Sequence, residues 1–311
     1  LFNNNPTVPS FRCSFIKFFK IFRTKRLSNN SQFHKELKYE LTIYNSSKLI
    51  TLLTNGHLAL EHALDTINIK GEIITTPFTF ASTSHAIIRK GFKPVFCDIN
   101  KGDYNLDPSK IEALITSKTV AIMPVHVYGS PCDNDTIMQI AHKHNLKVIY
   151  DAAHAFGVNV NGKPIAQMGD ISMFSFHATK VFNTLEGGAL VFKDQKDYEK
   201  VNAMINFGIT GKNQVGEIGG NAKMDELRAA VGICNLKKLP KAIQQRQKIT
   251  ERYESHLNNI SGLKLLKRKA DVKYNYAYFP VLVDGFKKDR ETIIEELAKE
   301  GIEARRYFYP L

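Results

Sequence analysis

The chain of 311 residues has no tryptophan, only four cysteines, and no apolar run long enough to span a membrane. Its cysteines are far apart, without C-x-x-C spacing, at Cys13, Cys97, Cys132 and Cys234. This usage argues against a metal centre and against a disulfide framework, and predicts a reducing compartment, the cytoplasm. We expect no secretory leader. Because the chain starts with Leu1 rather than methionine, we allow for a missing N-terminus.

Acidic residues are also in short supply. There are 30 Asp and Glu against 43 Lys and Arg, a formal net charge of +13. Such a charge is compatible with nucleic-acid binding. However, the basic residues are spread along the chain and no nucleic-acid motif accompanies them. We therefore expect no nucleic-acid partner and a basic surface that favours small anionic substrates.

The first 36 residues are basic and irregular. Residues 15–26 mix aromatic and basic side chains at near-helical spacing. Two interpretations remain open: a helix on a membrane surface, or an entry helix that packs its phenylalanine face on the body of the protein. We favour the second and expect no membrane partner. A helix-like segment follows at 34–44.

Strand-like and helix-like segments alternate from residue 49 onward. The apolar strand runs are 49–53, 72–75, 94–98, 120–125, 147–151, 171–176 and 189–192. Helical patterns fill most gaps, as at 58–67 and 136–144. This alternation predicts an α/β fold, a mostly parallel sheet with helices on both faces. Ligands of such sheets bind at the carboxyl ends of the strands, where Asp151, His126 and residues 55–57 fall.

The pattern becomes helical after residue 194. We expect helices at 196–206, 225–236 and 243–257, with Pro240 breaking the run between the last two. Residues 208–220 are glycine-rich and predict a mobile loop. A strand at 276–283 and a helix at 290–300 begin a smaller α/β domain that is cut off at Leu311. The predicted divisions are an N-terminal arm with entry helices (1–45), a large domain (46–240), and a connecting helix with a partial small domain (241–311).

A single lysine, Lys180, follows the buried strand run at 171–176. A lone lysine is usually a solvated charge. A lysine in a partly desolvated pocket has a lowered pKa and can form a Schiff base with an aldehyde. Ser175 lies five residues before it.

Another candidate, Asp151, ends a strand of pure core character. A buried carboxylate is costly without a charged partner. It could cap a helix, or form a salt bridge to a protonated pyridine nitrogen. His154 could then stack on, or hydrogen-bond to, the same ring.

Two further segments complete a possible cofactor site. Gly56 and His57 join a strand to a helix, where backbone amides can bind a phosphate, although glycine at such turns is often steric. Phe80 could belong to the core or lie flat on a planar cofactor. Pyridoxal phosphate needs a Schiff-base lysine, an acid for its ring nitrogen, a phosphate cup and a ring cover. Together with Lys180 and Ser175, all four roles have candidates, so we predict pyridoxal 5'-phosphate as the cofactor and no metal.

The chain resembles the DegT/DnrJ/EryC1/StrS family of sugar-nucleotide aminotransferases, a branch of the fold-type I pyridoxal-phosphate enzymes. The resemblance runs from about residue 30 to the end. It rests on TNGHLAL (54–60), TTPFTFAST (75–83), PVFCDI (94–99), PVHVYG (124–129), DAAHAFG (151–157), FSFHATK (174–180), EGGA (186–189) and GGNAKMDELRAA (219–230).

The resemblance implies a role for each matching residue. Lys180 corresponds to the lysine that binds the cofactor aldehyde and later shuttles the proton. Asp151 corresponds to the aspartate that keeps the pyridine nitrogen protonated. Ser175 and the backbone at Gly56 and His57 correspond to phosphate ligands.

Three more positions match. Phe80 takes the place of the ring-stacking aromatic residue, and His154 that of the residue beside the ring, which is glutamine in many relatives. Asn221 corresponds to an asparagine that reaches the phosphate of the neighbouring subunit's cofactor. The resemblance therefore implies a homodimer with shared active sites.

The implied reaction moves the amino group of L-glutamate to a nucleotide-linked keto-sugar, for cell-surface polysaccharide or O-antigen synthesis. The motifs are most similar to the branch that aminates C4 of dTDP-4-keto-6-deoxy-D-glucose. A 3-keto-sugar aminotransferase and a truncated non-catalytic relative remain alternatives. A sugar dehydratase is disfavoured, because those relatives carry histidine where Lys180 stands. His57 replaces the usual serine or threonine, and the chain ends earlier than most relatives.

Overall fold

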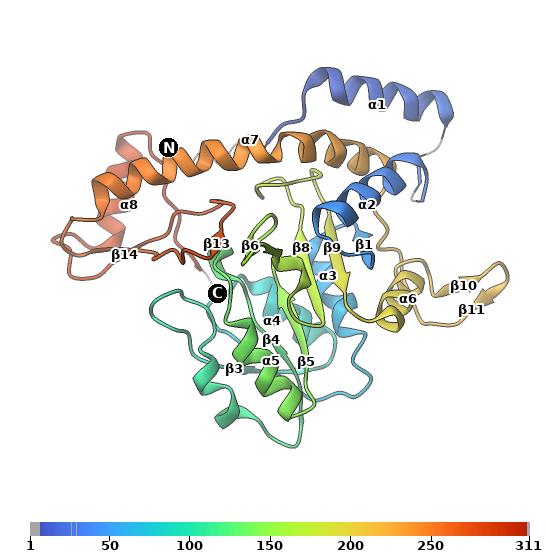
Figure 1. Ribbon diagram of the computed structural model, residues 1–311, viewed down its shortest axis with the longest axis horizontal. Helices are drawn as coiled ribbons and strands as arrows, with labels where there is room; N and C mark the ends of the chain where they lie inside the picture. Colours follow the sequence, from blue (N-terminus) through green and yellow to red (C-terminus); the bar gives the residue numbers. More distant parts are fainter. Residues whose placement is uncertain (1–6, 26, 29, 310–311) are drawn as a thin grey trace.

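The computed structural model describes residues 7–309 except 26 and 29. Its centre is a sheet of seven strands in the order β1-β9-β8-β5-β4-β2-β3 (Figure 1). Strand β9 runs antiparallel to β1 and β8, and the other four neighbouring pairs are parallel. The strands are β1 (Ile50–Leu53), β2 (Glu72–Thr75), β3 (Lys93–Phe96), β4 (Thr119–Met123), β5 (Lys147–Asp151), β8 (Ile171–Ser175) and β9 (Gly188–Phe192). The predicted α/β fold with a mostly parallel sheet is confirmed.

Helices cover both faces of the sheet. Because strand side chains alternate between faces, Met173 points into the core beneath α3 (Gly56–Leu64), α4 (Ala81–Arg89) and α6 (Gln195–Met204). The next residue, Phe174, joins the core beneath α2 (Gln32–Tyr44) and α7 (Glu226–Leu257). Helix α5 (Asn134–Lys143) packs on β4 and β5 through a third cluster. Short 3-10 helices occupy Pro108–Lys110, Glu112–Leu114, Val127–Gly129 and Ile165–Gln167.

Helix α7 is continuous over 32 residues with Pro240 inside it. The predicted break at Pro240 is therefore wrong. Proline removes one backbone hydrogen bond from a helix, but Pro240 is exposed, so the freed carbonyl can face water. Residues on both sides of Pro240 are anchored, Leu239 in the core and Thr250 fully buried. The division of domains at residue 240 stays a prediction, and α7 runs across it.

The glycine-rich segment predicted as a loop forms a hairpin of β10 (Ile209–Gly211) and β11 (Gln214–Val215). The strand expected at 276–283 is reduced to β14 (Val281–Val283), which pairs with β12 (Leu263–Leu265). The left-handed backbone of Tyr276, with φ of 51°, interrupts the extended run. The remaining elements are β6 (Asn159–Val160), β7 (Lys163–Pro164), β13 (Val272–Lys273) and α8 (Arg290–Lys299).

The N-terminal helix α1 (Phe11–Thr24) lies along the outside of α7 (Figure 1). Only part of its apolar surface packs on the body: Ile21 is buried and Phe18 is partly buried against the core. Phe15 and Phe19 are exposed. The prediction that this helix packs its phenylalanine face on the body is therefore only partly correct.

A disulfide joins Cys13 of α1 to Cys234 of α7. The prediction against disulfides is wrong for this pair, because packing of α1 on α7 brings together two cysteines that are 221 positions apart in the sequence. Cys97 and Cys132 are free thiols in the core. Among the described helices, none combines the length and the apolar character needed to cross a membrane.

Candidate active site

The predicted acid, Asp151, is the last residue of β5 and is 5% exposed. Its Oδ2 accepts a hydrogen bond from the Thr83 hydroxyl (2.7 Å), and its Oδ1 accepts one from the Ala153 amide (3.0 Å). Thr83 lies in the first turn of α4 and also contacts Thr79 (2.8 Å). The helix-cap alternative does not hold, because no helix begins at Asp151.

Burial raises the pKa of Asp151, while the hydrogen bonds from Thr83 and Ala153 and the charge of Lys180 lower it. Burial is the largest of these effects, because a carboxylate loses its hydration inside the protein. No Lys, Arg or His of the described chain forms an ion pair with Asp151. The site therefore holds a buried carboxylate for which a cationic ligand would be favourable.

Lys180 lies in the turn after β8 and is half-buried. Its Nζ donates to the Tyr278 hydroxyl at 3.3 Å and lies 5.9 Å from the centre of that ring. Burial lowers the pKa of Lys180, and the charges of Asp151 and Tyr307 oppose that shift. A larger share of the amine is therefore neutral near physiological pH than in water, which is the form that attacks an aldehyde.

The start of α3 lies directly against Ser175. A Cβ added to Gly56 would stand 2.9 Å from the Ser175 Cβ, and one added to Gly188 would stand 2.9 Å from the Gly56 amide nitrogen. Both positions therefore require glycine. Asn55 caps the helix by accepting from the Leu58 amide (2.8 Å). The first amides of a helix have no partner within it and attract anions, so Gly56, His57 and Ser175 could together hold a phosphate, and we call them the phosphate cradle.

The His57 side chain contacts Ser82 and Glu61. Its Nδ1 lies 2.8 Å from the Ser82 hydroxyl and its Nε2 lies 3.1 Å from Glu61. The imidazole is thus engaged on both nitrogens. His57 could offer its backbone amide to a phosphate, and the expectation that its side chain does not replace the usual hydroxyl stays a prediction.

His154 is buried, with its Nδ1 accepting from the Tyr128 amide at 3.2 Å. This hydrogen bond leaves the proton of the neutral ring on Nε2. Burial, together with the charge of Lys180, holds the pKa of His154 well below its usual range. Its ring lies 4.4 Å from that of Tyr278 and 6.1 Å from that of Phe308. His154 is therefore a neutral member of an aromatic wall next to Lys180.

The last two predicted residues, Phe80 and Asn221, are both exposed but lie on different segments. Phe80 precedes α4 and is 67% exposed, so it is not a core residue and is free to cover a planar ligand. Asn221 is exposed after the β10–β11 hairpin and pairs with Asn206 through a backbone bridge. Among the described residues, no hydrogen bond or ion pair joins Asn221 to the other predicted site residues.

Several site residues were not predicted. Thr83 holds Asp151, and Tyr278 holds Lys180. Phe78, Tyr104, Tyr128, Tyr307 and Phe308 extend the aromatic wall. Phe78, Thr83 and Tyr128 lie in the motifs at 75–83 and 124–129, so their position in these motifs was the available signal. Tyr104, Tyr307 and Phe308 lie outside the motifs noted above. Tyr278 comes from a segment that carries no motif.

The site thus combines a lysine amine, a buried carboxylate and an anion cradle at the carboxyl ends of a mostly parallel sheet, an arrangement suited to amino-group transfer through a carbonyl cofactor. The sequence pattern of the DegT/DnrJ/EryC1/StrS aminotransferase family matches residues 17–311, and the chain belongs to that family.

Relatives and solved structures agree with this family. The chain is 41% identical to a dTDP-4-amino-4,6-dideoxy-D-glucose transaminase of Shigella dysenteriae, over 100% of this chain and 85% of the relative. It is 42% identical to an enzyme of the same name from Escherichia coli, over 94% of this chain and 79% of that relative. The crystal structure of DesI with its TDP-sugar product is 31% identical with a TM-score of 0.93, over 99% of this chain and 79% of that one. Helicobacter pylori PseC, an aminotransferase of pseudaminic acid biosynthesis, is 27% identical with a TM-score of 0.91, over 97% and 84%.

Proposed function

We propose that this aminotransferase uses pyridoxal 5'-phosphate to move the amino group of L-glutamate to dTDP-4-keto-6-deoxy-D-glucose, giving dTDP-4-amino-4,6-dideoxy-D-glucose. The two relatives at 41% and 42% identity carry the name of this activity, which supports the choice of sugar and of C4. A cytoplasmic location and a role in cell-surface polysaccharide synthesis fit such a reaction.

The observation that carries the proposal is the buried Asp151 carboxylate, which has no ion-pair partner among the residues that the structure describes and interacts electrostatically with Lys180. A protonated pyridine nitrogen is the kind of cation that such a carboxylate would bind. Gly56 lies directly against Ser175 at the start of α3, where the unpaired helix amides could hold a phosphate. The residues present therefore fit pyridoxal phosphate. When bound, this cofactor withdraws electrons from the carbon that carries the amino group.

Lys180 would first bind the cofactor and then, once released by the amino donor, move the proton. Its lowered pKa favours the neutral amine, which can accept a proton from the substrate carbon and return it. The Tyr278 hydroxyl, 3.3 Å from Nζ, limits where the freed amine can swing. Lys180 would thus act as nucleophile and then as general acid and base.

Asp151 would keep its negative charge throughout the reaction. The hydrogen bonds from Thr83 and from the Ala153 amide are made to its carboxylate oxygens, and they orient both. His154 remains neutral and would present its Nε2 proton to the ligand side, since Nδ1 is occupied by the Tyr128 amide. The aromatic rings around it would exclude water from the reacting carbon.

Asn221 would complete the active site of a second subunit in a homodimer. Its exposure beside the β10–β11 hairpin supports this role, because a residue that reaches a neighbouring subunit has to lie at the surface. Asn221→Ala is expected to weaken cofactor binding while leaving Lys180 in place.

The test is an aminotransfer assay with L-glutamate and dTDP-4-keto-6-deoxy-D-glucose, in which the amino sugar is detected by mass spectrometry. We expect product from the wild type and none from Lys180→Ala. A dTDP-linked 3-keto-sugar and a GDP-linked 4-keto-sugar serve as control substrates. Turnover of a control substrate at a higher rate than the proposed one would reject the sugar assignment. Turnover by Lys180→Ala near the wild-type rate would reject the mechanism.

A further inference from the structure

Helix α1 exposes a stripe of four aromatic side chains. Phe11, Phe15, Phe19 and Phe22 are 83%, 58%, 62% and 66% exposed. Their spacing of four, four and three residues puts them on one side of the helix. We propose that this aromatic stripe docks the enzyme on an anionic membrane surface.

The opposite side of α1 is firmly attached to the body. Cys13 is bonded to Cys234 of α7, and Lys17 pairs with Glu36 of α2 at 2.8 Å. Ile21 is 1% exposed in the core beneath the helix. These contacts fix the rotation of α1, so the stripe cannot turn inward without breaking them. The stripe therefore faces outward in this structure.

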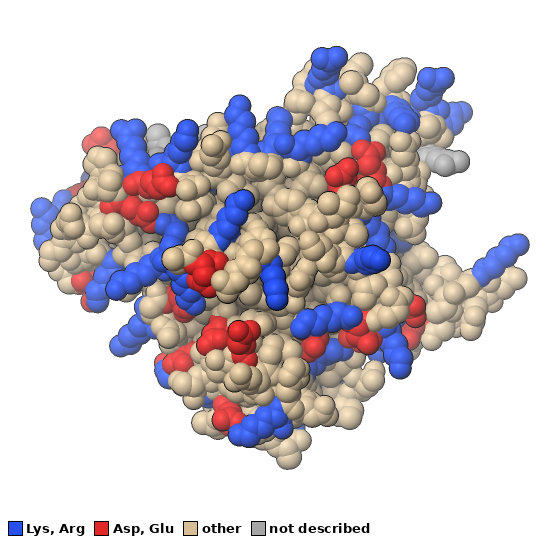
Figure 2. Space-filling view, in the orientation of Figure 1, with Lys and Arg blue, Asp and Glu red and all other residues tan. Residues whose placement is uncertain are grey.

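The charge on α1 is of one sign. The first 35 residues contain no Asp or Glu, and Figure 2 shows Lys and Arg but no acidic side chain over α1. At 100° per residue, Arg12 and Arg23 lie beside the aromatic stripe and Lys20 lies further round the same outward half. Among the described residues, no carboxylate forms an ion pair with these three side chains. Free cations beside exposed rings are the chemistry that anionic lipid headgroups favour.

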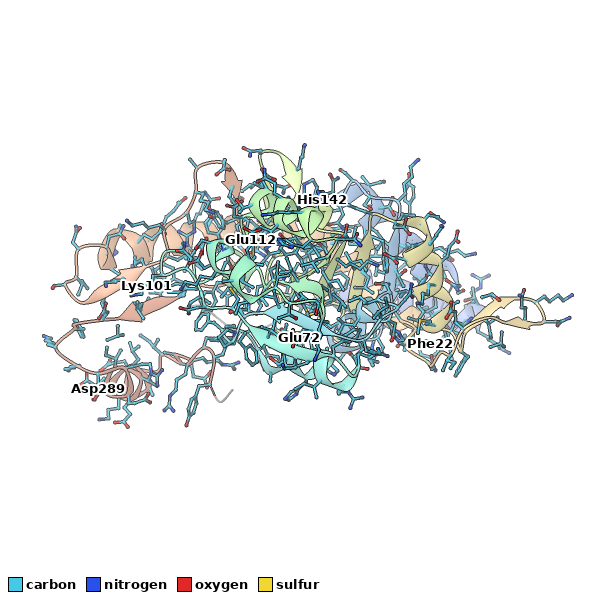
Figure 3. All side chains as sticks on the ribbon, turned by 90° about the horizontal axis from the view of Figure 1, so that it is seen from below. Phe22, Glu72, Lys101, Glu112, His142 and Asp289 are labelled. Carbon is cyan, nitrogen blue, oxygen red and sulfur yellow. A yellow bond between two sulfur atoms is a disulfide. The ribbon has the colours of Figure 1, made fainter. Side chains whose placement is uncertain are left out.

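Two other arrangements fit the helix less well. With 14 residues, α1 is too short to span a bilayer, so it would lie along the surface. A second copy docked stripe to stripe would set Arg12, Lys20 and Arg23 against the same cations of its partner, which opposes association through this face. The homodimer proposed above would instead use the surface around Asn221. The stripe also lies away from the C-terminal unit: Figure 3 places Phe22 in the half of the molecule opposite Asp289, the residue that caps α8.

The absence of tryptophan makes a direct test possible. Phe19→Trp puts the only tryptophan of the 311-residue chain on the stripe, and Ile69→Trp puts a single tryptophan at a 73% exposed position away from α1. Both are titrated with vesicles of phosphatidylcholine mixed with phosphatidylglycerol, and with vesicles of phosphatidylcholine alone. We expect the emission of Phe19→Trp to shift to shorter wavelength with the anionic vesicles only. Emission of Ile69→Trp should not shift.

Loss-of-binding variants test the same surface without a reporter. In co-sedimentation with anionic vesicles, Phe11→Ser combined with Phe15→Ser should bind at least about tenfold more weakly than wild type. Ile69→Ser is the matched control and should bind normally. Arg12→Gln with Arg23→Gln should weaken binding and flatten its dependence on salt. Because all these residues are exposed, the unfolding midpoints should remain unchanged.

Three outcomes would overturn the proposal. One is a wild type that does not bind anionic vesicles. Another is equal binding to vesicles with and without anionic lipid. The third is a stripe variant that binds as wild type does but changes the oligomeric state in sedimentation velocity, which would assign the stripe to a second copy of the chain. The test does not depend on aminotransferase activity.

Discussion

Replacing Asp151 by asparagine should stabilise the cofactor-free protein while disabling the enzyme. Asparagine has nearly the same shape as aspartate. Its carbonyl oxygen can keep the hydrogen bond from the Ala153 amide, and its NH2 group can donate to the Thr83 hydroxyl. Thr83 would then donate to Thr79, whose hydroxyl lies 2.8 Å away. The substitution therefore removes a buried charge without leaving a polar atom unpaired.

The size of the effect follows from the pKa of Asp151. Burial raises that pKa above the ordinary value of 3.8. The ionised carboxylate therefore lowers the free energy of unfolding as the pH rises from 3.8 to the folded-state pKa. Above the folded-state pKa, this loss of stability is complete and stays constant. Each unit of raised pKa corresponds to about 1.4 kcal/mol. Cofactor-free Asp151→Asn should therefore unfold at a higher temperature than wild type at neutral pH, by roughly 2 °C for each kcal/mol of cost that the substitution removes. The difference should vanish near pH 3.8.

The assay compares unfolding temperatures of wild type and Asp151→Asn with and without pyridoxal phosphate. The cofactor should raise the unfolding temperature of the wild type more than that of Asp151→Asn, because only a carboxylate can pair with a protonated ring nitrogen. Turnover of the variant should fall by several orders of magnitude, since proton removal lacks its electron sink. The reasoning is refuted if the cofactor-free variant is less stable than wild type at neutral pH, or if its turnover is near normal.

Three further predictions concern other parts of the structure. Gly56→Ala should weaken binding of pyridoxal phosphate by roughly tenfold in an absorbance titration, because the new Cβ would stand 2.9 Å from that of Ser175 and push α3 outward; an unchanged dissociation constant would contradict the cradle. Cys13→Ser should lower the free energy of unfolding in urea by about 2–4 kcal/mol, because it opens the bond to Cys234; wild type treated with a reductant should match it, and an unchanged urea midpoint would count against the bond. Burial lowers the pKa of His126 to about 3, so below pH 6.5 this residue binds a proton in the unfolded chain but not in the folded one, and its own contribution should lower stability by at most about 1.4 kcal/mol per pH unit. His126→Asn should flatten that decline between pH 6.5 and 4, and an equally steep slope would exclude His126 as its source.

Much of the central sheet could be predicted because each strand is a local pattern. The runs ending at Asp151 and Ser175 are apolar, and helix-like segments separate them, so their ends fall at one edge of a parallel sheet. Lys180 could be chosen because it follows a buried run within the segment FSFHATK, close to Ser175. These inferences need only the order of residues along the chain.

Features that depend on distant packing could not be predicted in this way. The hydroxyls of Thr83 and Tyr278 are separated by 68 and 98 positions from the residues that they hold. Cys13 meets Cys234 only because α1 packs on α7. Pro240 is tolerated inside α7 because its side of the helix faces solvent, which its own residue type does not reveal. In each case the deciding contact comes from another element.

The most direct test of the account is to identify the residue that binds the cofactor. The protein is incubated with pyridoxal phosphate, reduced with borohydride so that any bond to an amine becomes permanent, digested, and analysed by peptide mass spectrometry. The account predicts one modified residue, Lys180, and no modification of that peptide after prior treatment with L-glutamate, which should release the lysine. Modification of another lysine, or of none in the folded protein, would contradict it.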